Sequence, residues 1–199
     1  VFNLQLGGPP TPEGYRLAPW DAARQGEVAR LIHAAFHDKS DAMWDPRFRS
    51  LQGADSVTWF ITGGQMGQHL ADCTRLLLKR DPVMGTEGRT ESVAGFCFLV
   101  QADALKGNIP LIGVDPAERG KGLGNLLLRE TVSAAMRGIV EGRLGMTEIN
   151  ATLDTDNVSA VRMYRRFGFV EDHHYPHAYL PRELAERLTP GQWCVTPPY

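Results

Sequence analysis

Cysteine is scarce in this sequence, with three residues among 199, and long apolar runs are absent. Cys73, Cys97 and Cys194 lack the close spacing of metal ligands, so we expect free thiols in a reducing compartment. No apolar stretch approaches the roughly 20 residues that a membrane-spanning helix needs. The first residues also lack the charged start and apolar core of a secretion signal. These absences predict a cytoplasmic protein with no membrane partner.

Neither sign of charge is in excess, since 21 Lys and Arg face 23 Asp and Glu and give a formal net charge of −2. Nucleic-acid-binding domains are usually basic, so no nucleic-acid partner is expected. The length suits one domain, at roughly 100–200 residues per domain, and no repeat is visible. We expect an extended arm over residues 1–14, a single domain over 15–180 and a C-terminal extension over 181–199.

A glycine-rich stretch stands between a short apolar run and a Leu-rich segment. The run at 111–114 suits a buried strand that ends before Pro116. Three glycines then alternate with other residues, beside two basic ones: Arg119, Gly120, Lys121, Gly122 and Gly124. Glycine permits positive φ and close backbone approach, and the start of the next helix adds a partial positive charge. This order predicts a site for a diphosphate.

Two better-known glycine motifs do not fit this stretch. A phosphate-binding P-loop needs four residues between its first glycine and Gly-Lys, followed by Ser or Thr, whereas Gly122 follows Lys121 here. A dinucleotide-binding fingerprint needs Gly-x-Gly-x-x-Gly, and Gly124 comes one residue too early. A tight strand-to-helix turn with surface charges is the remaining structural interpretation.

A second motif covers residues 157–169. Asn157 can cap a helix, and Gly168 can end it in the left-handed conformation. Ala160 and Tyr164 are four residues apart and share one helix face. Taken alone, the segment is an amphipathic helix in which Tyr164 would be a core aromatic.

Together these motifs resemble the two signatures of the GNAT N-acetyltransferase superfamily. The first is Arg119-x-x-Gly122-x-Gly124 after Val-Asp-Pro, and the second is Asn157-x-x-Ala160-x-x-x-Tyr164-x-x-x-Gly168-Phe169. The resemblance is good over 92–169 and loose over 15–80. It implies a mixed α/β (α+β) fold, with a twisted, mainly antiparallel sheet flanked by helices. The fourth and fifth strands, here 109–114 and 147–153, are expected to splay apart.

The resemblance also implies an activity and a set of site residues. Such proteins transfer the acetyl group of acetyl-CoA directly to a primary amine of a small molecule or peptide, without a metal. Tyr164 is the implied general acid, and the Val114 N–H would polarise the thioester carbonyl. The implied cofactor-binding residues are Ile112, Gly113, Val114, Arg119, Gly120, Lys121, Gly122, Leu123, Gly124, Asn125 and Asn157.

The general base is less well defined by the sequence. Many family members carry Glu on the fourth strand, where this chain has Asn108, Leu111 and Ile112. The candidates elsewhere can equally be surface or packing residues: Glu148, Asn150, His33, His37 and Asp38. A non-catalytic acyl-CoA sensor or scaffold, or an enzyme that uses a different acyl-CoA, therefore remains an alternative, and a homodimer is left open.

Two charged clusters receive structural interpretations. His173, His174 and His177 lack a fourth ligand nearby, so no metal is expected there. Arg162, Arg165 and Arg166 are expected on a solvated helix face, with Arg166 in reach of a CoA phosphate.

Hydrophobic periodicity and turn residues predict the remaining elements. Strands are expected at 15–18, 74–79, 91–101, 108–114, 149–153 and 169–171, with 91–101 central and covered on both faces. Helices are expected at 21–37, 122–140, 157–167 and 182–188. Over 38–69 the pattern favours short helices with aromatic packing. The resemblance to the GNAT superfamily implies that this insert shapes the acceptor pocket.

Overall fold

The computed structural model describes residues 9–39, 41–81 and 90–174. Contacts group the chain into two units, Val1–Phe169 and Val170–Tyr199, and only 170–174 of the second unit are described. The predicted extension over 181–199 and the predicted helix over 182–188 lie outside the described residues.

Eight strands form two four-stranded sheets in the described part of the chain. The first has the order β1-β3-β4-β7 and is antiparallel throughout: β1 (Tyr15–Pro19), β3 (Arg75–Asp81), β4 (Thr90–Cys97) and β7 (Ile112–Val114). The second has the order β2-β5-β6-β8: β2 (Gln68–His69), β5 (Val100–Gln101), β6 (Lys106–Asn108) and β8 (Glu148–Asn150). In this sheet β6 and β8 are parallel.

The strands predicted at 91–101 and 108–114 are each divided between the two sheets. The first becomes β4 and β5, and the second becomes β6 and β7. Ile109 still donates from its N–H to the Asn150 carbonyl at 2.9 Å, but Pro110 follows and has no N–H to continue the ladder. Beyond that residue β7 pairs with β4 and separates from β8. The expected splay of the fourth and fifth strands is confirmed.

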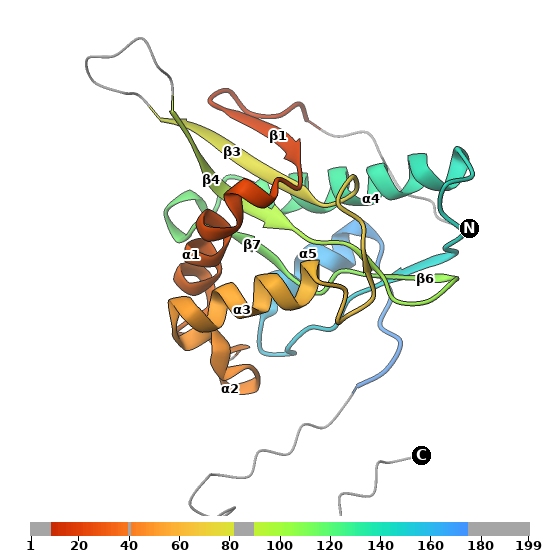
Figure 1. The fold of residues 1–199 in the computed structure, drawn as a ribbon. Helices are drawn as coiled ribbons and strands as arrows, with labels where there is room; N and C mark the ends of the chain where they lie inside the picture. The colour runs from red at the N-terminus through yellow and green to blue at the C-terminus, as the bar shows by residue number, and fades with distance from the viewer. Residues whose placement is uncertain (1–8, 40, 82–89, 175–199) are drawn as a thin grey trace, which may run out of the picture. The chain divides into compact units, whose positions relative to one another are not determined.

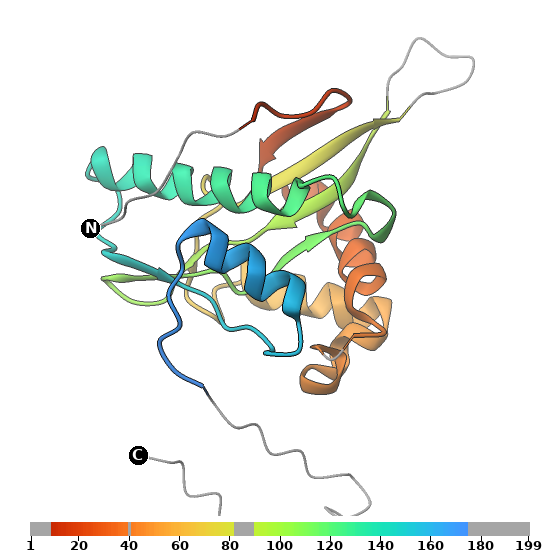
Figure 2. The ribbon, with the colours of Figure 1, turned by 180° about the vertical axis from the view of Figure 1, so that it is seen from behind.

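Five α-helices and three 3₁₀ turns connect the described strands. They are η1 (Ala22–Arg24), α1 (Gln25–Phe36), α2 (Asp41–Trp44), η2 (Pro46–Arg49), α3 (Leu51–Thr62), η3 (Pro116–Glu118), α4 (Leu123–Val140) and α5 (Val158–Phe167). Helices α1 and α3 cover one face of the first sheet, and α4 and α5 cover the other (Figures 1 and 2). The predicted helices at 21–37, 122–140 and 157–167 therefore form, the first with a 3₁₀ opening turn capped by Asp21.

Two apolar cores lie on the two faces of the first sheet. Leu76 and Phe96 pack in the cluster with α1 and α3, whereas their strand neighbours Leu77 and Cys97 pack in the cluster with α4 and Tyr164. Successive side chains of a strand point to opposite faces of the sheet, so β3 and β4 contribute side chains to both cores. The expectation that the strand at 91–101 is covered on both faces is confirmed.

One strand prediction is wrong. Residues 169–174 form no strand, because none of the described strands pairs with them. The apolar start of that segment, Phe169, instead packs its ring edge-on against Tyr164, with centroids 4.9 Å apart. No helix among the described residues is long and apolar enough to cross a bilayer.

Candidate functional site

The glycine loop connects η3 to α4 and exposes its backbone. Gly120 and Gly122 have φ values of 81° and 75°, in the left-handed region that favours glycine. A Cβ added to either would meet no atom within 4 Å. Both positions therefore combine a conformation that needs glycine with open space beside the backbone, which lets a ligand approach the main chain.

Helix α4 begins without a side-chain cap. Its N-cap is Gly122, and its first backbone bond runs from Leu126 N to Gly122 O at 3.2 Å. Within the described residues, no acceptor is seen for the N–H groups of the first helical turn, which are those of Leu123, Gly124 and Asn125. Such donors at the positive end of a helix suit an anionic oxygen.

Helices α3 and α5 begin with a side-chain cap, whereas α1 continues from the 3₁₀ turn η1 and has no side-chain cap of its own. Ser50 Oγ accepts from Gly53 N at 3.0 Å at the start of α3, and Asn157 Oδ1 accepts from Ala160 N at 3.2 Å at the start of α5. Gly124 has a packing role in addition, because a Cβ there would lie 3.1 Å from the Met163 sulfur of α5. The third glycine thus lets α4 and α5 approach closely.

Strand β7 presents one unpaired edge next to this loop. The Leu111 carbonyl accepts from the backbone after β4 at 3.0 Å, and the Asp115 N–H donates to β4 at 2.9 Å. Backbone groups alternate along an antiparallel ladder, so Gly113 also faces β4, while Ile112 and Val114 face away. None of the described strands pairs with that far edge. Ile112 and Val114 can therefore bind an extended ligand, whereas the Gly113 amide is directed toward β4.

Tyr164 lies in the apolar core on the α4 side of the first sheet. It is 3% exposed and belongs to the same cluster as Cys97, the β4 residue that pairs with Ile112. Burial raises the pKa of Tyr164 well above its usual value, and the Cys97 thiol adds to the shift. Burial likewise raises the pKa of Cys97, to about 12. Both groups therefore keep their protons at neutral pH.

The two basic residues of the loop are held by protein partners. Arg119 donates from Nη2 to the Ala35 carbonyl of α1 at 3.0 Å. Lys121 pairs through Nζ with Glu118 and donates to the Tyr15 hydroxyl at 3.3 Å. The N–H groups in the first turn of α4 are therefore the donors at this loop for which the described residues show no protein acceptor.

Residues 83–171 match the family model described as "Acetyltransferase (GNAT) domain". This range contains β7, the glycine loop, α4 and α5 with Tyr164. Residues 83–171 are therefore identified as a GNAT acetyltransferase domain. The uncapped α4 start, the open β7 edge and the buried tyrosine are thus features of a GNAT domain.

Two curated relatives carry acetyltransferase names. "Mycothiol acetyltransferase" of Gordonia bronchialis is 30% identical over 173 residues, which are 84% of this chain and 49% of that protein. "N-alpha-acetyltransferase RimI" of Mycobacterium tuberculosis is 35% identical over 82 residues, which are 41% of this chain and 46% of that protein. The chain spans about half the length of the curated relatives it matches.

Solved structures share the fold at low sequence identity. The structure of yncA from Salmonella typhimurium "with its cofactor Acetyl-CoA" has a TM-score of 0.60 to this chain. The two are 17% identical, and the match covers 85% of this chain and 87% of that chain. The GNAT fold expected from the two motifs is confirmed.

The sequence-derived base candidates of this GNAT domain have surface or packing partners. Glu148 is exposed and lies 3.4 Å from the Lys106 ammonium, and Asn150 pairs with Asn108 in the β6–β8 ladder. On α1, the His33 ring contacts the Phe48 carbonyl at 3.0 Å. His37 and Asp38 follow at the exposed end of α1, where Asp38 pairs with Lys39 at 3.6 Å. Their roles stay predictions.

The remaining predicted residues occupy the elements expected for them. Asn157 caps α5, and Arg162, Arg165 and Arg166 lie on its exposed face. His173 and His174 contact the neighbouring carboxylates of Asp172 and Glu171, whereas His177 lies outside the described residues. Among the residues described, no group of three or more His, Cys, Asp or Glu is placed to hold a metal.

Two titratable residues of the region were missed by sequence reasoning. Glu118 is buried at the start of the loop, although its sequence context suggests only a surface charge. Asp41 opens α2, where burial raises the pKa of its carboxyl and the Asp154 charge adds to the shift. Asp41 and Asp154 are far apart in sequence, so only the fold could place them near each other.

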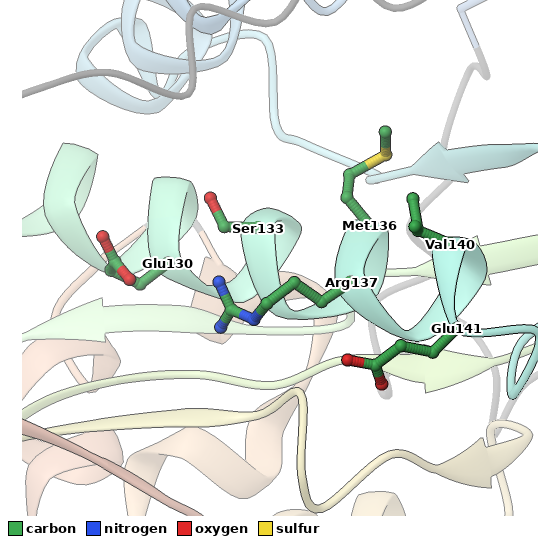
Figure 3. A pocket seen from close by; sticks show the side chains of 6 residues that line it. All are labelled: Glu130, Ser133, Met136, Arg137, Val140 and Glu141. Carbon is green, nitrogen blue, oxygen red and sulfur yellow. The ribbon is translucent and has the colours of Figure 1, made fainter.

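A separate hollow of about 410 Å³ lies along one face of α4, away from the loop (Figure 3). It is lined by Glu130, Ser133, Met136, Arg137, Val140 and Glu141. These residues follow one helical stripe, and none belongs to the predicted site. The candidate acyl-CoA site is therefore the edge and loop formed by residues 112–125, together with Tyr164.

Proposed function

We propose that this domain transfers the acetyl group of acetyl-CoA to a primary amine. The observation that supports it most is that two neighbouring backbone segments have hydrogen-bonding groups without a protein partner among the described residues. The first is the uncapped start of α4 after Gly122, and the second is the open edge of β7 at Ile112 and Val114. The first suits a pyrophosphate and the second an extended amide-bearing arm. Coenzyme A carries both groups in that order.

In this proposal, bound acetyl-CoA supplies a thioester whose carbon is attacked by the amine nitrogen. A C–N bond forms and the C–S bond breaks, so the amine loses a proton and the sulfur gains one. The Val114 N–H donates to the carbonyl oxygen as negative charge develops there. A single well-placed donor of this kind can contribute about 3–4 kcal/mol.

Tyr164 holds the proton that the leaving sulfur receives. Its raised pKa keeps the hydroxyl protonated at neutral pH, and also makes the transfer to a thiolate unfavourable. A thiol titrates near about 8.5, so the proton returns to tyrosine from solvent after the sulfur departs. Tyr164 is therefore protonated, and able to donate, at the start of each catalytic cycle.

The acceptor must lose its own proton before it attacks. A lysine-like amine with a pKa near 10.4 is only about 0.04% neutral at pH 7, so a base or a water chain is required. The names of the curated relatives favour a small-molecule amine, and the shorter match to RimI adds a peptide N-terminus as the second class. The insert at 38–69 is the proposed selector of the acceptor.

A binding measurement followed by an assay tests this function. At about 100 times its Kd, acetyl-CoA should stabilise the fold by about 2.7 kcal/mol, which raises the Tm. Mass spectrometry of co-purifying CoA species would identify the acyl donor, and a panel of small amines and peptide N-termini would identify the acceptor. A folded protein whose Tm is unchanged at millimolar acetyl-CoA would contradict the proposal.

A further inference from the structure

The carboxylate of Glu118 is buried at the start of the glycine loop. Its side chain is 5% exposed, yet three donors surround it: the Tyr15 hydroxyl, Lys79 Nζ at 2.6 Å and Lys121 Nζ. The first two come from β1 and β3, and the third comes from the loop itself. One carboxylate thus ties the loop to two strands of the first sheet.

Arg119 ties the same loop to a different element. Its guanidinium donates to the Ala35 carbonyl near the end of α1, at 3.0 Å. The loop is therefore fastened to β1 and β3 through Glu118 and Lys121, and to α1 through Arg119. Both basic side chains of the motif have protein partners as the structure stands.

These contacts matter because a glycine-containing backbone has much conformational freedom unless other contacts restrain it. Gly120 and Gly122 have no side chains to pack, and glycine loses more conformational freedom on ordering than any other residue. A loop that is ordered in advance does not have to lose that freedom when a ligand binds. Charge-assisted hydrogen bonds to a buried carboxylate are strong enough to provide such order.

We propose that Glu118 is a positioning residue of the acyl-CoA site. It holds Lys79, Lys121 and Tyr15 so that the loop is ordered before acetyl-CoA binds. Phosphate recognition then falls to the backbone N–H groups of the loop and α4. This inference rests on the proposed function, and its rival is that Lys79 and Lys121 bind the phosphates directly while Glu118 competes with them.

The sign of one mutational effect separates the two models. Under the rival model, Glu118→Gln removes a competing negative charge and tightens acetyl-CoA binding. If Glu118 positions the loop, the same change weakens binding, and Kd rises about tenfold when the competent loop falls to about one molecule in ten. Isothermal titration with acetyl-CoA on the folded protein measures this directly.

Tyr15→Phe provides a test in which no charge changes. It removes one donor to Glu118 and one acceptor for Lys121, and it leaves both lysines and the carboxylate in place. The positioning model expects Kd to rise between about two- and tenfold, the equivalent of one hydrogen bond. The rival model expects Kd to stay unchanged or to fall, because Lys121 loses one protein partner. This variant decides the question if Glu118→Gln fails to fold.

Glu91→Gln is the matched control. Glu91 pairs with Arg16 of β1, so it also joins β1 to the sheet and its loss changes the charge equally. It takes no part in the loop contacts described above, and Kd for acetyl-CoA should stay unchanged.

Steady-state kinetics distinguish positioning from loss of folded enzyme. Glu118→Gln should raise KM for acetyl-CoA and leave kcat at saturation nearly unchanged, whereas partial unfolding would lower apparent kcat alone. Unchanged or tighter binding in Glu118→Gln, or in Tyr15→Phe, would overturn the inference. A wild-type protein that binds no acetyl-CoA would instead overturn the proposed function.

Discussion

Tyr164 is the single residue on which the proposed chemistry depends most. Tyr164→Phe keeps the buried ring and its contact with Phe169 and removes only the hydroxyl. General acid catalysis typically contributes about 10²–10⁴-fold, so kcat should fall by that factor while Kd for acetyl-CoA changes little. The deficit should shrink with acyl donors whose thiol is more acidic, because these need less help in leaving.

Tyr15→Phe is the natural comparison for that experiment, since it should change KM and leave kcat alone. Full turnover of Tyr164→Phe at saturating acetyl-CoA would assign the proton to water. In that case Tyr164 would be a core aromatic, and its loss would show mainly as a lower Tm.

Gly122 tests whether the open loop is the binding surface. Valine at Gly122 would have to adopt a φ of 75° and would place its side chain in the open space beside the loop. The left-handed conformation costs a residue with a Cβ about 1–2 kcal/mol. We expect Gly122→Val to abolish acetyl-CoA binding while the circular dichroism spectrum stays close to that of the wild type.

Gly142→Val controls for backbone strain. Gly142 has a φ of 72° and equally open surroundings, but it lies after the opposite end of α4. Gly142→Val should lower the free energy of unfolding by about as much as Gly122→Val does, and it should leave acetyl-CoA affinity unchanged. Equal affinity losses in both variants would show that strain, and not the site, explains the effect of Gly122→Val.

At the scale of elements, α5 depends on the cap that Asn157 provides. Asn157→Ala removes an N-cap side chain, which costs about 1 kcal/mol of stability. Because the motif also implies contact with the cofactor, this variant should weaken acetyl-CoA binding in addition. Urea unfolding and titration calorimetry measure the two effects separately.

Ser50→Ala removes the equivalent cap of α3, on the other face of the sheet. Its stability loss should match that of Asn157→Ala, without any effect on acetyl-CoA affinity. If both variants bind acetyl-CoA like the wild type, Asn157 serves α5 alone.

At the scale of the whole molecule, Glu118 makes stability depend on acid pH. Hydrogen bonds from Lys121, Lys79 and Tyr15 lower the pKa of Glu118 to about 2, whereas an unfolded glutamate titrates near about 4.3. The folded state therefore binds fewer protons, and this contribution is complete above about pH 4.3 and is lost as pH falls toward 2.

The comparison with Glu118→Gln makes that contribution visible. The difference in unfolding free energy between wild type and variant should be constant from pH 5 to 7 and narrow below about pH 4.3. Urea unfolding at a series of pH values measures it. A difference that stays the same down to pH 2 would mean that the carboxylate is not held ionised by its three donors.

The sequence by itself determined the local parts of this site. Glycine at 120 and 122, Pro116 before the loop, and the Asn157 and Gly168 caps act within a few residues, so their effects on the backbone can be predicted from the chain alone. Alternation and helical periodicity likewise placed β3, β4, α1, α4 and α5, because burial on two faces follows the residue pattern.

Only the tertiary structure decided which groups meet across long sequence distances. The division of residues 106–114 between two sheets depends on β8, a strand about 40 residues later in the sequence. Its hydrogen bonds to this segment end at Ile109, the residue before Pro110. Glu118 is buried and joins the loop to the first sheet because Tyr15 of β1 and Lys79 of β3 donate to its carboxylate. These residues lie 103 and 39 positions earlier in the sequence. For the same reason Arg119 and Lys121, which the motif offered as phosphate ligands, were found with protein partners. Local sequence fixes backbone conformation, whereas the partners of a long charged side chain depend on which strands the fold brings beside it.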